Sequence, residues 1–282
     1  MSLLPKLAIL AGGGSAPAKL AAACRATERP YHLVCLKGHA EADLGQGHPH
    51  TLLSLGELGK FRDLCRAEGI QEIVMIGHVR RPSLSELRPD WLTMKILAKI
   101  GLNALGDDAV LRAVGKVLEE ECQVRLIGAS AILGDLLTPE GALTKHMPNE
   151  QASSDIERAV EVALSLGEMD VGQAVIVQEG IVLGVEAVEG TDALIARSAD
   201  VRREGAGGVL VKLAKPQQDS RLDLPTIGPD TVQNAHQAGL AGIALEAGRS
   251  QIVDREMTIE IADRLGLFIV GLSLQGKDKT YG

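Results

Sequence analysis

Aromatic residues are scarce in this chain of 282 residues, at 2% of its composition. The scarcity argues against stacking platforms for nucleic-acid bases, sugar-stacking lectin sites and the aromatic belts of membrane proteins. Basic residues are also in deficit, because 37 Asp and Glu outnumber 29 Lys and Arg and leave a net charge of −8. This balance argues against DNA or RNA as a partner, since polyanions bind through a basic face. A small anionic substrate is still allowed, because a few local cations are enough to hold it.

The four cysteines (Cys24, Cys35, Cys65 and Cys122) lie far apart in the first half of the chain and form no C-x-x-C pair. This spacing argues against a zinc site and a disulfide framework, and it is typical of a reducing compartment. Long hydrophobic runs are missing too. The N-terminus lacks the apolar core of a signal peptide, and no run reaches the roughly 18 apolar residues of a membrane span. We therefore expect a cytoplasmic protein.

The first half of the chain alternates short apolar runs with amphipathic helical patterns, as in a parallel sheet covered by helices. At roughly 150 residues per domain the chain is long enough for about two domains. The pattern predicts an N-terminal Rossmann-like α/β domain over residues 1–134. The expected strands are 7–11, 31–37, 51–55, 72–79 and 123–127, and the expected helices are 16–27, one around 58–65, 91–100 and one from 107.

Residues 135–150 are rich in Gly, Pro and Thr, and we predict that they link two domains. A C-terminal mixed α/β domain is predicted over 151–282. Its first helix is expected to start at a capping box, Ser154 to Glu157. Glu179-Gly180 suits the tight turn of a hairpin. The other expected elements are strands at 174–178, 181–186, 209–213, 243–246 and 267–271, and helices at 230–237 and 257–265.

A glycine run, Gly12-Gly13-Gly14, falls between the first strand and the first helix. Glycines at this place let backbone N–H groups approach a phosphate, and the helix N-terminus favours negative charge. A nicotinamide dinucleotide fits poorly, because Pro17 stands at the third glycine position of the fingerprint and Lys37 stands where an acidic ribose ligand is needed. The turn therefore either contacts another phosphate or nucleotide or serves only to connect the strand to the helix.

Three other segments have two interpretations each. Gly106-Asp107-Asp108 is either a helix N-cap or part of a magnesium site. His39, His48 and His50 favour a polar loop over a metal site, because no matching acidic or cysteine ligand follows. The helix at 91–100 is apolar nearly all round, so it is either core or a lipid-contacting element.

The strongest constellation lies between residues 179 and 228. A strand ends at Glu186 and leads to a helix start at Thr191-Asp192, and a later loop carries two lysines and two aspartates (Lys212, Lys215, Asp219 and Asp223). Carboxylate oxygens suit magnesium, and lysine suits phosphate oxygens. This mixture is what hydrolysis of a phosphoanhydride needs, because a metal neutralises developing charge while a carboxylate orients water. The alternative is a solvated loop with surface ion pairs.

At these motifs the sequence resembles the LpxI-type UDP-2,3-diacylglucosamine pyrophosphatases of lipid A biosynthesis. The resemblance covers essentially the whole chain, through LAGGGSAP at 10–17, GDD at 106–108, EGIVLGVEAVEGTDALI at 179–195 and KLAKPQQDSRLDLPTIG at 212–228. It implies two domains that enclose the substrate. It also implies magnesium-assisted hydrolysis to UMP and 2,3-diacylglucosamine 1-phosphate (lipid X), with water attacking the phosphorus nearest the sugar.

Roles for individual residues follow partly from this resemblance and partly from the motifs described above. Catalytic roles are expected for Asp223, Asp219, Lys215 and Asp192; substrate binding for Gly12, Gly13, Gly14, Thr191, Gln218, Thr226 and Lys212; and magnesium binding for Asp219, Asp223 and Glu186. The substrate's acyl chains need an apolar surface, and we expect the helix at 91–100, through Leu92 and Ile96, to line their path or touch the inner face of the inner membrane as a weak peripheral contact.

Two rival functions stay open at this point: a non-catalytic nucleotide-sugar or lipid binding protein, and a nicotinamide-dependent oxidoreductase. The oligomeric state is also open, with a homodimer among the alternatives. Acyl-chain preference, the number of metal ions and the identity of the base are not encoded in these patterns.

Overall fold

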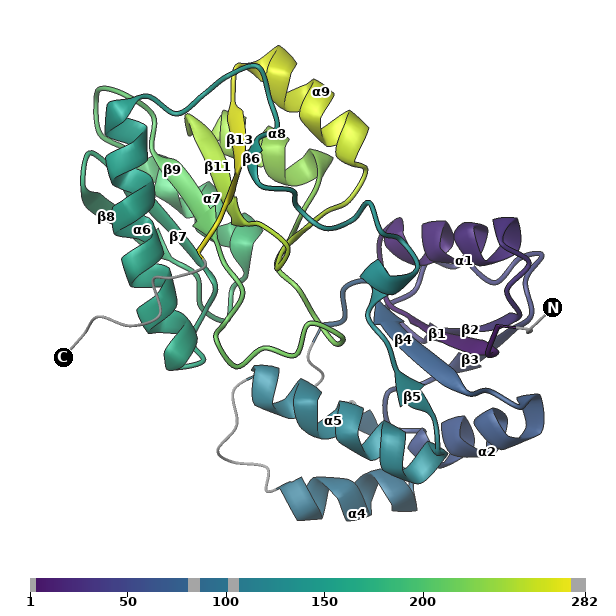
Figure 1. The fold of residues 1–282 in the computed structure, drawn as a ribbon. Coiled ribbons are helices and arrows are strands. Elements are labelled where there is room, and N and C mark those ends of the chain that lie inside the picture. Colours follow the sequence, from purple (N-terminus) through teal and green to yellow (C-terminus); the bar gives the residue numbers. More distant parts are fainter. Residues whose placement is uncertain (1–3, 81–86, 101–106, 275–282) are drawn as a thin grey trace. The chain divides into compact units, whose positions relative to one another are not determined.

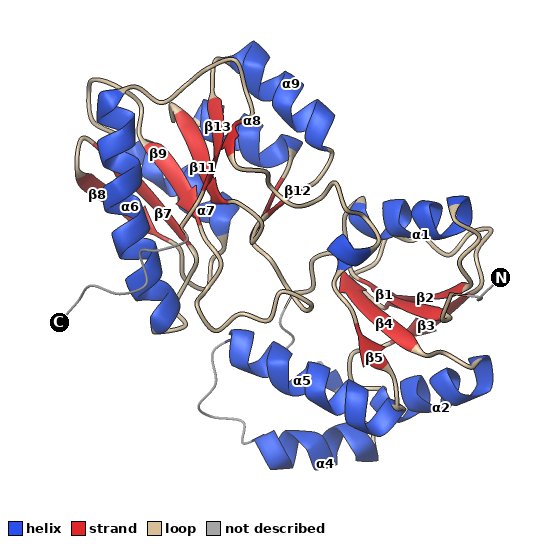
Figure 2. Cartoon of the chain, in the orientation of Figure 1, coloured by secondary structure: helices blue, strands red, loops and turns tan. Residues whose placement is uncertain are grey.

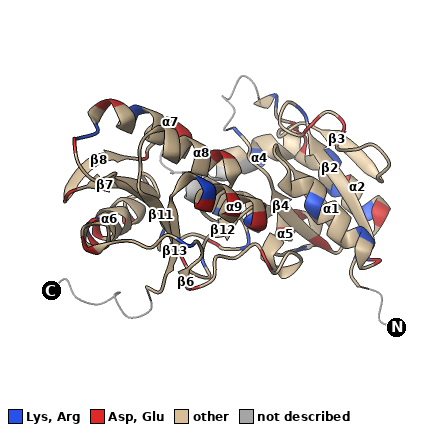
Figure 3. Cartoon of the chain, turned by 90° about the horizontal axis from the view of Figure 1, so that it is seen from above, with Lys and Arg blue, Asp and Glu red and all other residues tan. Residues whose placement is uncertain are grey.

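The chain folds into two compact units, one formed by residues 1–134 with 219–223 and the other by 135–218 with 224–282. The computed structural model describes residues 4–80, 87–100 and 107–274 (Figure 1). Charged residues lie mainly on helices and loops, while the strands are mostly uncharged (Figure 3). No helix in the described part of the chain is long and apolar enough to cross a membrane.

The first unit is built on a five-stranded parallel sheet of order β3-β2-β1-β4-β5. Helix α1 lies on one face, and α2, α4 and α5 lie on the other (Figure 1). This arrangement confirms the α/β fold with a parallel N-terminal sheet. The strands are β1 (Leu7–Ala11), β2 (Tyr31–Leu36), β3 (His50–Leu53), β4 (Glu72–Ile76) and β5 (Arg125–Leu126), and the helices are α1 (Ala16–Ala26), α2 (Leu58–Glu68), α4 (Trp91–Ile100), α5 (Asp107–Cys122) and the 3-10 turn η1 (Ala129–Ala131).

The second unit is built on a mixed six-stranded sheet of order β6-β13-β11-β9-β7-β8. Strands β9, β11 and β13 are parallel, whereas β7 runs antiparallel to β9 and β8. The elements are β6 (Gly141–Ala142), α6 (Glu150–Glu168), β7 (Ala174–Gln178), β8 (Ile181–Val185), α7 (Thr191–Ser198), η2 (Ala199–Val201), β9 (Val209–Lys212), β10 (Thr226–Ile227), α8 (Pro229–Gln237), β11 (Gly242–Glu246), β12 (Gln251–Ile252), α9 (Arg255–Leu265) and β13 (Phe268–Leu272) (Figure 2).

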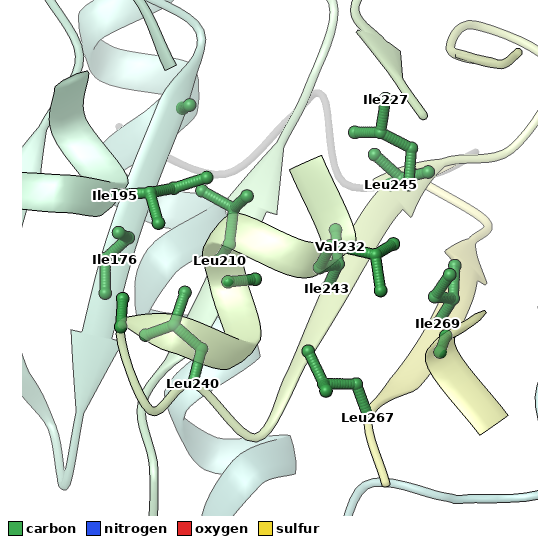
Figure 4. Close-up of a cluster of buried hydrophobic side chains, with 14 of the residues drawn as sticks. Ile176, Ile195, Leu210, Ile227, Val232, Leu240, Ile243, Leu245, Leu267 and Ile269 are labelled. Atoms are coloured by element: carbon green, nitrogen blue, oxygen red, sulfur yellow. The ribbon is translucent and has the colours of Figure 1, made fainter. Parts of the chain in front are cut away.

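Successive residues of the central strands face opposite sides of this sheet, as the pleat requires. Ile176, Leu210 and Ile243 pack with side chains of α7, α8 and α9 (Figure 4). Their neighbours Val177 and Val211 pack against α6. Because both faces of the sheet are covered, these strands are apolar up to their polar last residues, and this makes them recognisable in the sequence.

Helix α6 begins four residues before the predicted capping box, so that prediction is wrong. Asn149 caps the helix, and its side-chain oxygen accepts a hydrogen bond from the Ala152 N–H at 2.8 Å. Asp155, which the sequence placed at the helix start, is buried inside α6. Its carboxylate accepts hydrogen bonds from the N–H groups of Glu179 and Gly180 at 2.9 and 2.7 Å. An acidic residue predicted at a helix start can therefore accept hydrogen bonds from a neighbouring turn instead of capping the helix.

The hairpin between β7 and β8 is confirmed, with φ of 50° at Glu179 and 77° at Gly180. Positive φ at both turn residues matches the right-handed twist of the flanking strands. Residues 135–150, assigned above to a linker, fold with the second unit, where β6 pairs with Val270 and Gly271 of β13. The sequence did not reveal this strand, because two residues are too few to show the alternation of apolar and polar residues typical of a strand.

Candidate functional site

The ends of four strands meet at one edge of the second unit's sheet. Lys212, the last residue of β9, pairs with Leu245 of β11 and with Ala174, the first residue of β7. Glu186 follows β8, and its N–H donates to the Ala174 carbonyl at 2.8 Å. The carboxyl ends of parallel strands are where α/β sheets bind ligands. The two long motifs at 179–195 and 212–228 both reach this edge.

Lys215 is held at this edge through both its side chain and its main chain. Its ammonium lies 2.5 Å from the carboxylate of Asp170, and the two side chains are 10% and 17% exposed. Its N–H donates to the side-chain oxygen of Gln218 at 3.0 Å, and its carbonyl accepts hydrogen bonds from the Gln218 N–H and from Arg249. The predicted residues Lys215 and Gln218 are therefore in contact.

Lys212 and Thr226 also meet in the structure. The buried ammonium of Lys212 donates to the Thr226 carbonyl at 3.1 Å, and the Thr226 hydroxyl donates to the Leu224 carbonyl at 2.9 Å. These contacts connect the end of β9 to β10 across the intervening loop. An ammonium has three donors, so this contact does not use the full hydrogen-bonding capacity of Lys212.

Glu186 connects the sheet edge to the start of α7. One carboxylate oxygen accepts a hydrogen bond from the Thr191 hydroxyl at 2.6 Å, and the other accepts from the Gln173 N–H at 3.1 Å. The side chain is buried, so these bonds compensate for its loss of water. Asp192, one residue further along α7, is exposed and accepts a hydrogen bond from Asn234 of α8 at 3.2 Å.

The acidic loop is divided between the two units. The chain leaves the second unit after Gln218 and returns to it at Leu224. The short segment between these points, 219–223, folds with the first unit, where Leu222 is buried in the core formed with α5. A Cβ on Gly115 of α5 would lie 2.9 Å from a methyl group of Leu222, so this glycine leaves room for the segment.

Asp219 and Arg221 form an ion pair within this segment, at 2.7 Å between Oδ2 and Nη2. The Arg221 guanidinium also contacts Glu119 of α5 at 3.2 Å. Hydrogen bonds from Arg221 hold the pKa of the Asp219 carboxyl below its ordinary value, against the opposing effect of partial burial. Asp219 is thus ionised at neutral pH. Asp223 closes the segment and is exposed.

The glycine run connects two strands of the first unit. The Gly12 N–H donates to the Ile76 carbonyl at 2.8 Å, and Gly13 exchanges two hydrogen bonds with His78. A Cβ at Gly12 would lie 2.5 Å from the His78 carbonyl oxygen, and one at Gly13 would lie 2.6 Å from the His78 ring. The ends of β1 and β4 can approach this closely because both residues are glycine, and their N–H groups are used within the protein.

Gly14 differs from its two neighbours. It is exposed, has a φ of 90°, and its N–H lies 3.3 Å from the Glu41 carboxylate. It stands at the point where the strand order of the sheet reverses between β1 and β4, which is the usual position for a ligand in a doubly wound fold. His39 is beside the same turn, and burial, Arg80 and His78 lower its pKa.

The other two histidines of the predicted polar loop, His48 and His50, take part in a surface network. His48 Nδ1 lies 2.5 Å from the Tyr31 hydroxyl and 3.2 Å from Arg25, and His50 Nδ1 contacts the His48 carbonyl at 3.0 Å. In the described ranges no group of three or more His, Cys, Asp or Glu side chains lies close enough together to hold a metal ion. Gly106 lies outside the described residues, and α5 starts at Asp107.

Helix α4 is neither core throughout nor apolar surface throughout. Leu92 is 5% exposed, so the structure contradicts the expectation that it lines an acyl-chain path. Trp91 and Met94 are 76% and 54% exposed, and the Lys95 ammonium lies 5.6 Å from the centre of the Trp91 ring. The apolar surface described on this helix is therefore formed by residues other than Leu92, and the side chain of Ile96, the second predicted residue, lies outside the described part of the structure.

Three further residues of this edge, Asp170, Glu246 and Arg249, lie outside the predicted set. Glu246 ends an apolar strand at the same edge as Lys212, and its carboxylate accepts a hydrogen bond from the Ala214 N–H at 3.1 Å. Its position at a strand end could have identified it. Asp170 follows a helix with no motif around it. It becomes visible only when the fold brings it to Lys215, which is 45 positions later in the chain.

Comparison with known proteins gives matches along nearly the full sequence. Two family models match, the LpxI N-terminal domain over residues 6–136 and the LpxI C-terminal domain over residues 139–270. The UDP-2,3-diacylglucosamine pyrophosphatase LpxI of Caulobacter vibrioides is 43% identical over 277 residues, which cover 96% of this chain and 98% of that protein.

Among solved structures, the CobK precorrin-6A reductase is similar with a TM-score of 0.34 and 12% identity, covering 96% of this chain and 88% of that chain. A likeness of this size carries no argument about function. The two domain matches and the 43% identity, in contrast, establish family membership. The chain belongs to the LpxI family.

Proposed function

We propose that this protein hydrolyses the pyrophosphate bond of UDP-2,3-diacylglucosamine, giving UMP and 2,3-diacylglucosamine 1-phosphate. The observation that carries the proposal is the 43% identity, over 96% of the chain, to a relative named for action on this substrate. The arrangement of Lys212 and Lys215 at the carboxyl edge of a sheet supports it. Ammonium groups at that edge suit the phosphate oxygens of a nucleotide-sugar.

Lys215 is proposed to stabilise the charge that develops on the phosphate as the bond to the leaving group breaks. A preformed cation in a site of low water content contributes most when it is aimed at the developing charge. The held backbone and low exposure of Lys215 meet that condition. Asp223, exposed at the end of the segment, is proposed to orient or deprotonate the attacking water.

Magnesium is proposed as the cofactor, held by Asp219 and Asp223. The donor set fits this ion, because magnesium is commonly bound by one or two carboxylates together with substrate phosphates. Arg221 further favours the ionised form of Asp219 by lowering its pKa, and a carboxylate keeps further acceptor sites when it binds arginine. When bound, the ion would neutralise phosphate charge. Glu186, the third predicted ligand, belongs to the second unit, where its two oxygens accept hydrogen bonds from Thr191 and Gln173.

The test is turnover of the purified protein on UDP-2,3-diacylglucosamine in detergent micelles, with magnesium or with EDTA. We expect release of UMP with magnesium and a strong reduction with EDTA. In ¹⁸O-labelled water the label is expected in the sugar phosphate rather than in UMP, if water attacks the phosphorus nearest the sugar. Substrate that binds and is recovered intact would favour the non-catalytic binding protein instead.

Helix α4 is proposed to contact the lipid phase that carries the substrate. Trp91 and Met94 present apolar surface, and Lys95 beside the Trp91 ring suits an anionic interface. We expect Trp91→Ser with Met94→Ser to reduce sedimentation with vesicles containing anionic lipid. A matched control is Val201→Ser with Met257→Ser, two exposed apolar residues of the other unit. Equal sedimentation of the two double variants would contradict a membrane role for α4.

A further inference from the structure

Asp170 occupies a left-handed backbone position at a helix end, where three other helices in the described part of the chain have glycine. It follows α6 with a φ of 55°, its N–H donates to the Gly167 carbonyl at 3.0 Å, and the Val171 N–H donates to the Leu166 carbonyl at 3.1 Å. This is the Schellman helix ending, in which a left-handed residue, usually glycine, closes the helix. Helices α2, α8 and α9 end with left-handed glycines, which are Gly69, Gly239 and Gly266.

An aspartate is unfavourable at this position for two separate reasons. A side chain at positive φ brings its Cβ close to the backbone, which glycine avoids. A carboxylate at the end of α6 also faces the negative end of the helix dipole, which disfavours an anion. Local stability would therefore select glycine or asparagine here. At Asp170 a contact outside the helix end offsets these two costs.

That contact is the ion pair with Lys215. The carboxylate and ammonium are 2.5 Å apart, with side chains only 17% and 10% exposed. The same helix end also touches the backbone beside Lys215. A Cβ on Gly167 would lie 3.0 Å from Pro216 Cδ, and the Gly167 carbonyl accepts a hydrogen bond from Gln217 at 2.8 Å. The end of α6 and the turn at 215–218 are thus joined by an ion pair, a hydrogen bond and close packing.

We propose that Asp170 is a positioning residue, which fixes the direction of the Lys215 ammonium at the edge of the sheet. The main chain of Lys215 is held by Gln218 and Arg249, but these contacts leave its long side chain free to rotate. Asp170 removes that freedom. The inference rests on the proposed function, in which Lys215 stabilises phosphate charge.

Glu28 provides a matched control in the other unit. It follows α1 with a φ of 52°, its N–H donates to the Arg25 carbonyl, and the Arg29 N–H donates to the Cys24 carbonyl. Glu28 therefore has the same helix ending and the same unfavourable charge. It is exposed. Replacing it removes both unfavourable features without touching Lys215.

The experiment compares Asp170→Asn, Asp170→Gly, Asp170→Glu, Glu28→Gly and Lys215→Met in the full chain, by thermal unfolding and by UMP release. Glu28→Gly is expected to unfold at or above the wild-type temperature, whereas Asp170→Gly should unfold at a lower temperature than Glu28→Gly, because it leaves the largely buried Lys215 ammonium without its partner. Asp170→Asn and Asp170→Gly should also lower kcat by about 10- to 100-fold with KM little changed, because a misdirected cation acts mainly on the transition state. Asp170→Glu should keep a kcat between those of wild type and Asp170→Asn. Adding Asp170→Asn to Lys215→Met should lower kcat no further than Lys215→Met alone.

The outcomes separate this inference from the proposed function. If wild type releases UMP and Lys215→Met does not, while Asp170→Asn and Asp170→Gly turn over like wild type, the positioning role is overturned and the proposed function stands. A lower unfolding temperature for Asp170→Asn with unchanged kcat would make the ion pair purely structural. Absence of UMP release by wild type would overturn the proposed function, and the positioning role with it.

Discussion

At the scale of single residues, the carboxylates of this candidate site differ in their burial and in the groups that they contact. Glu186 is buried and used on both oxygens, Asp170 is paired with a lysine, and Asp219 is paired with an arginine. Asp223 is exposed at the end of its segment. Replacing an exposed carboxylate usually changes stability less than replacing a buried one, so a large loss of turnover in a folded variant would report chemistry.

Asp223→Ala is therefore expected to remove most turnover while the fold is kept. The change should alter the free energy of unfolding by no more than about 0.5 kcal/mol, as is usual for an exposed position. UMP release and urea unfolding measure the two effects separately. Near-normal kcat with an unchanged magnesium dependence would rule out the role proposed for Asp223.

Replacing Arg221 by Gln should raise the pKa of Asp219 toward its ordinary value. Arg221 lowers that pKa in the folded protein, so their pairing stabilises the fold above the unfolded-state pKa and is lost as the pH falls through the folded-state pKa. The acid limb of the kcat/KM profile should therefore move to higher pH in the variant. Carboxyl NMR of Asp219 checks the pKa directly, and Arg221→Lys, which keeps the charge, should shift it less. An unmoved acid limb would count against Asp219 as a group in the reaction.

At the scale of elements, the long apolar strands and amphipathic helices could be predicted because each buries a continuous set of residues. The shortest pieces could not. Strands β6, β10 and β12 have two residues each, and no alternation can show in two positions. The start of α6 was misplaced because Ser154 and Asn149 are both good capping residues, and only tertiary contacts decide which of them is used.

The two candidate caps of α6 can be compared directly. Asn149→Ala should lower the free energy of unfolding by about 1 kcal/mol, because the Ala152 N–H loses its side-chain partner. Ser154→Ala, at an exposed position inside the helix, should leave stability equal or slightly higher, since alanine is the better helix former. Urea unfolding of both variants measures the difference. A larger loss for Ser154→Ala would place the helix start where the sequence pattern put it.

At the scale of the whole molecule, the chain order does not match the division into units. The sequence indicated a loop with lysines and aspartates in one C-terminal domain, because neighbouring residues are read together. In the structure Gln218 belongs to the second unit and Asp219 to the first. The signal for this crossing is a single leucine, Leu222, among polar neighbours, and one apolar residue in a loop does not indicate which core it enters. The candidate site residues could be chosen from motifs, but their assignment to units could not.

Leu222 should therefore stabilise a unit to which most of its sequence neighbours do not belong. Leu222→Ala is expected to cost about 2–5 kcal/mol, as for other buried leucines, since it removes a side chain packed against α5. Hydrogen exchange should show lost protection in α5 and β4, while α6 and β9 stay protected. Leu213→Ala, which removes a buried leucine of the second unit, should give the opposite distribution. If Leu222→Ala loosened β9 and left α5 protected, the segment 219–223 would belong energetically to the second unit, and the aspartates of the acidic loop would share one unit with Lys215.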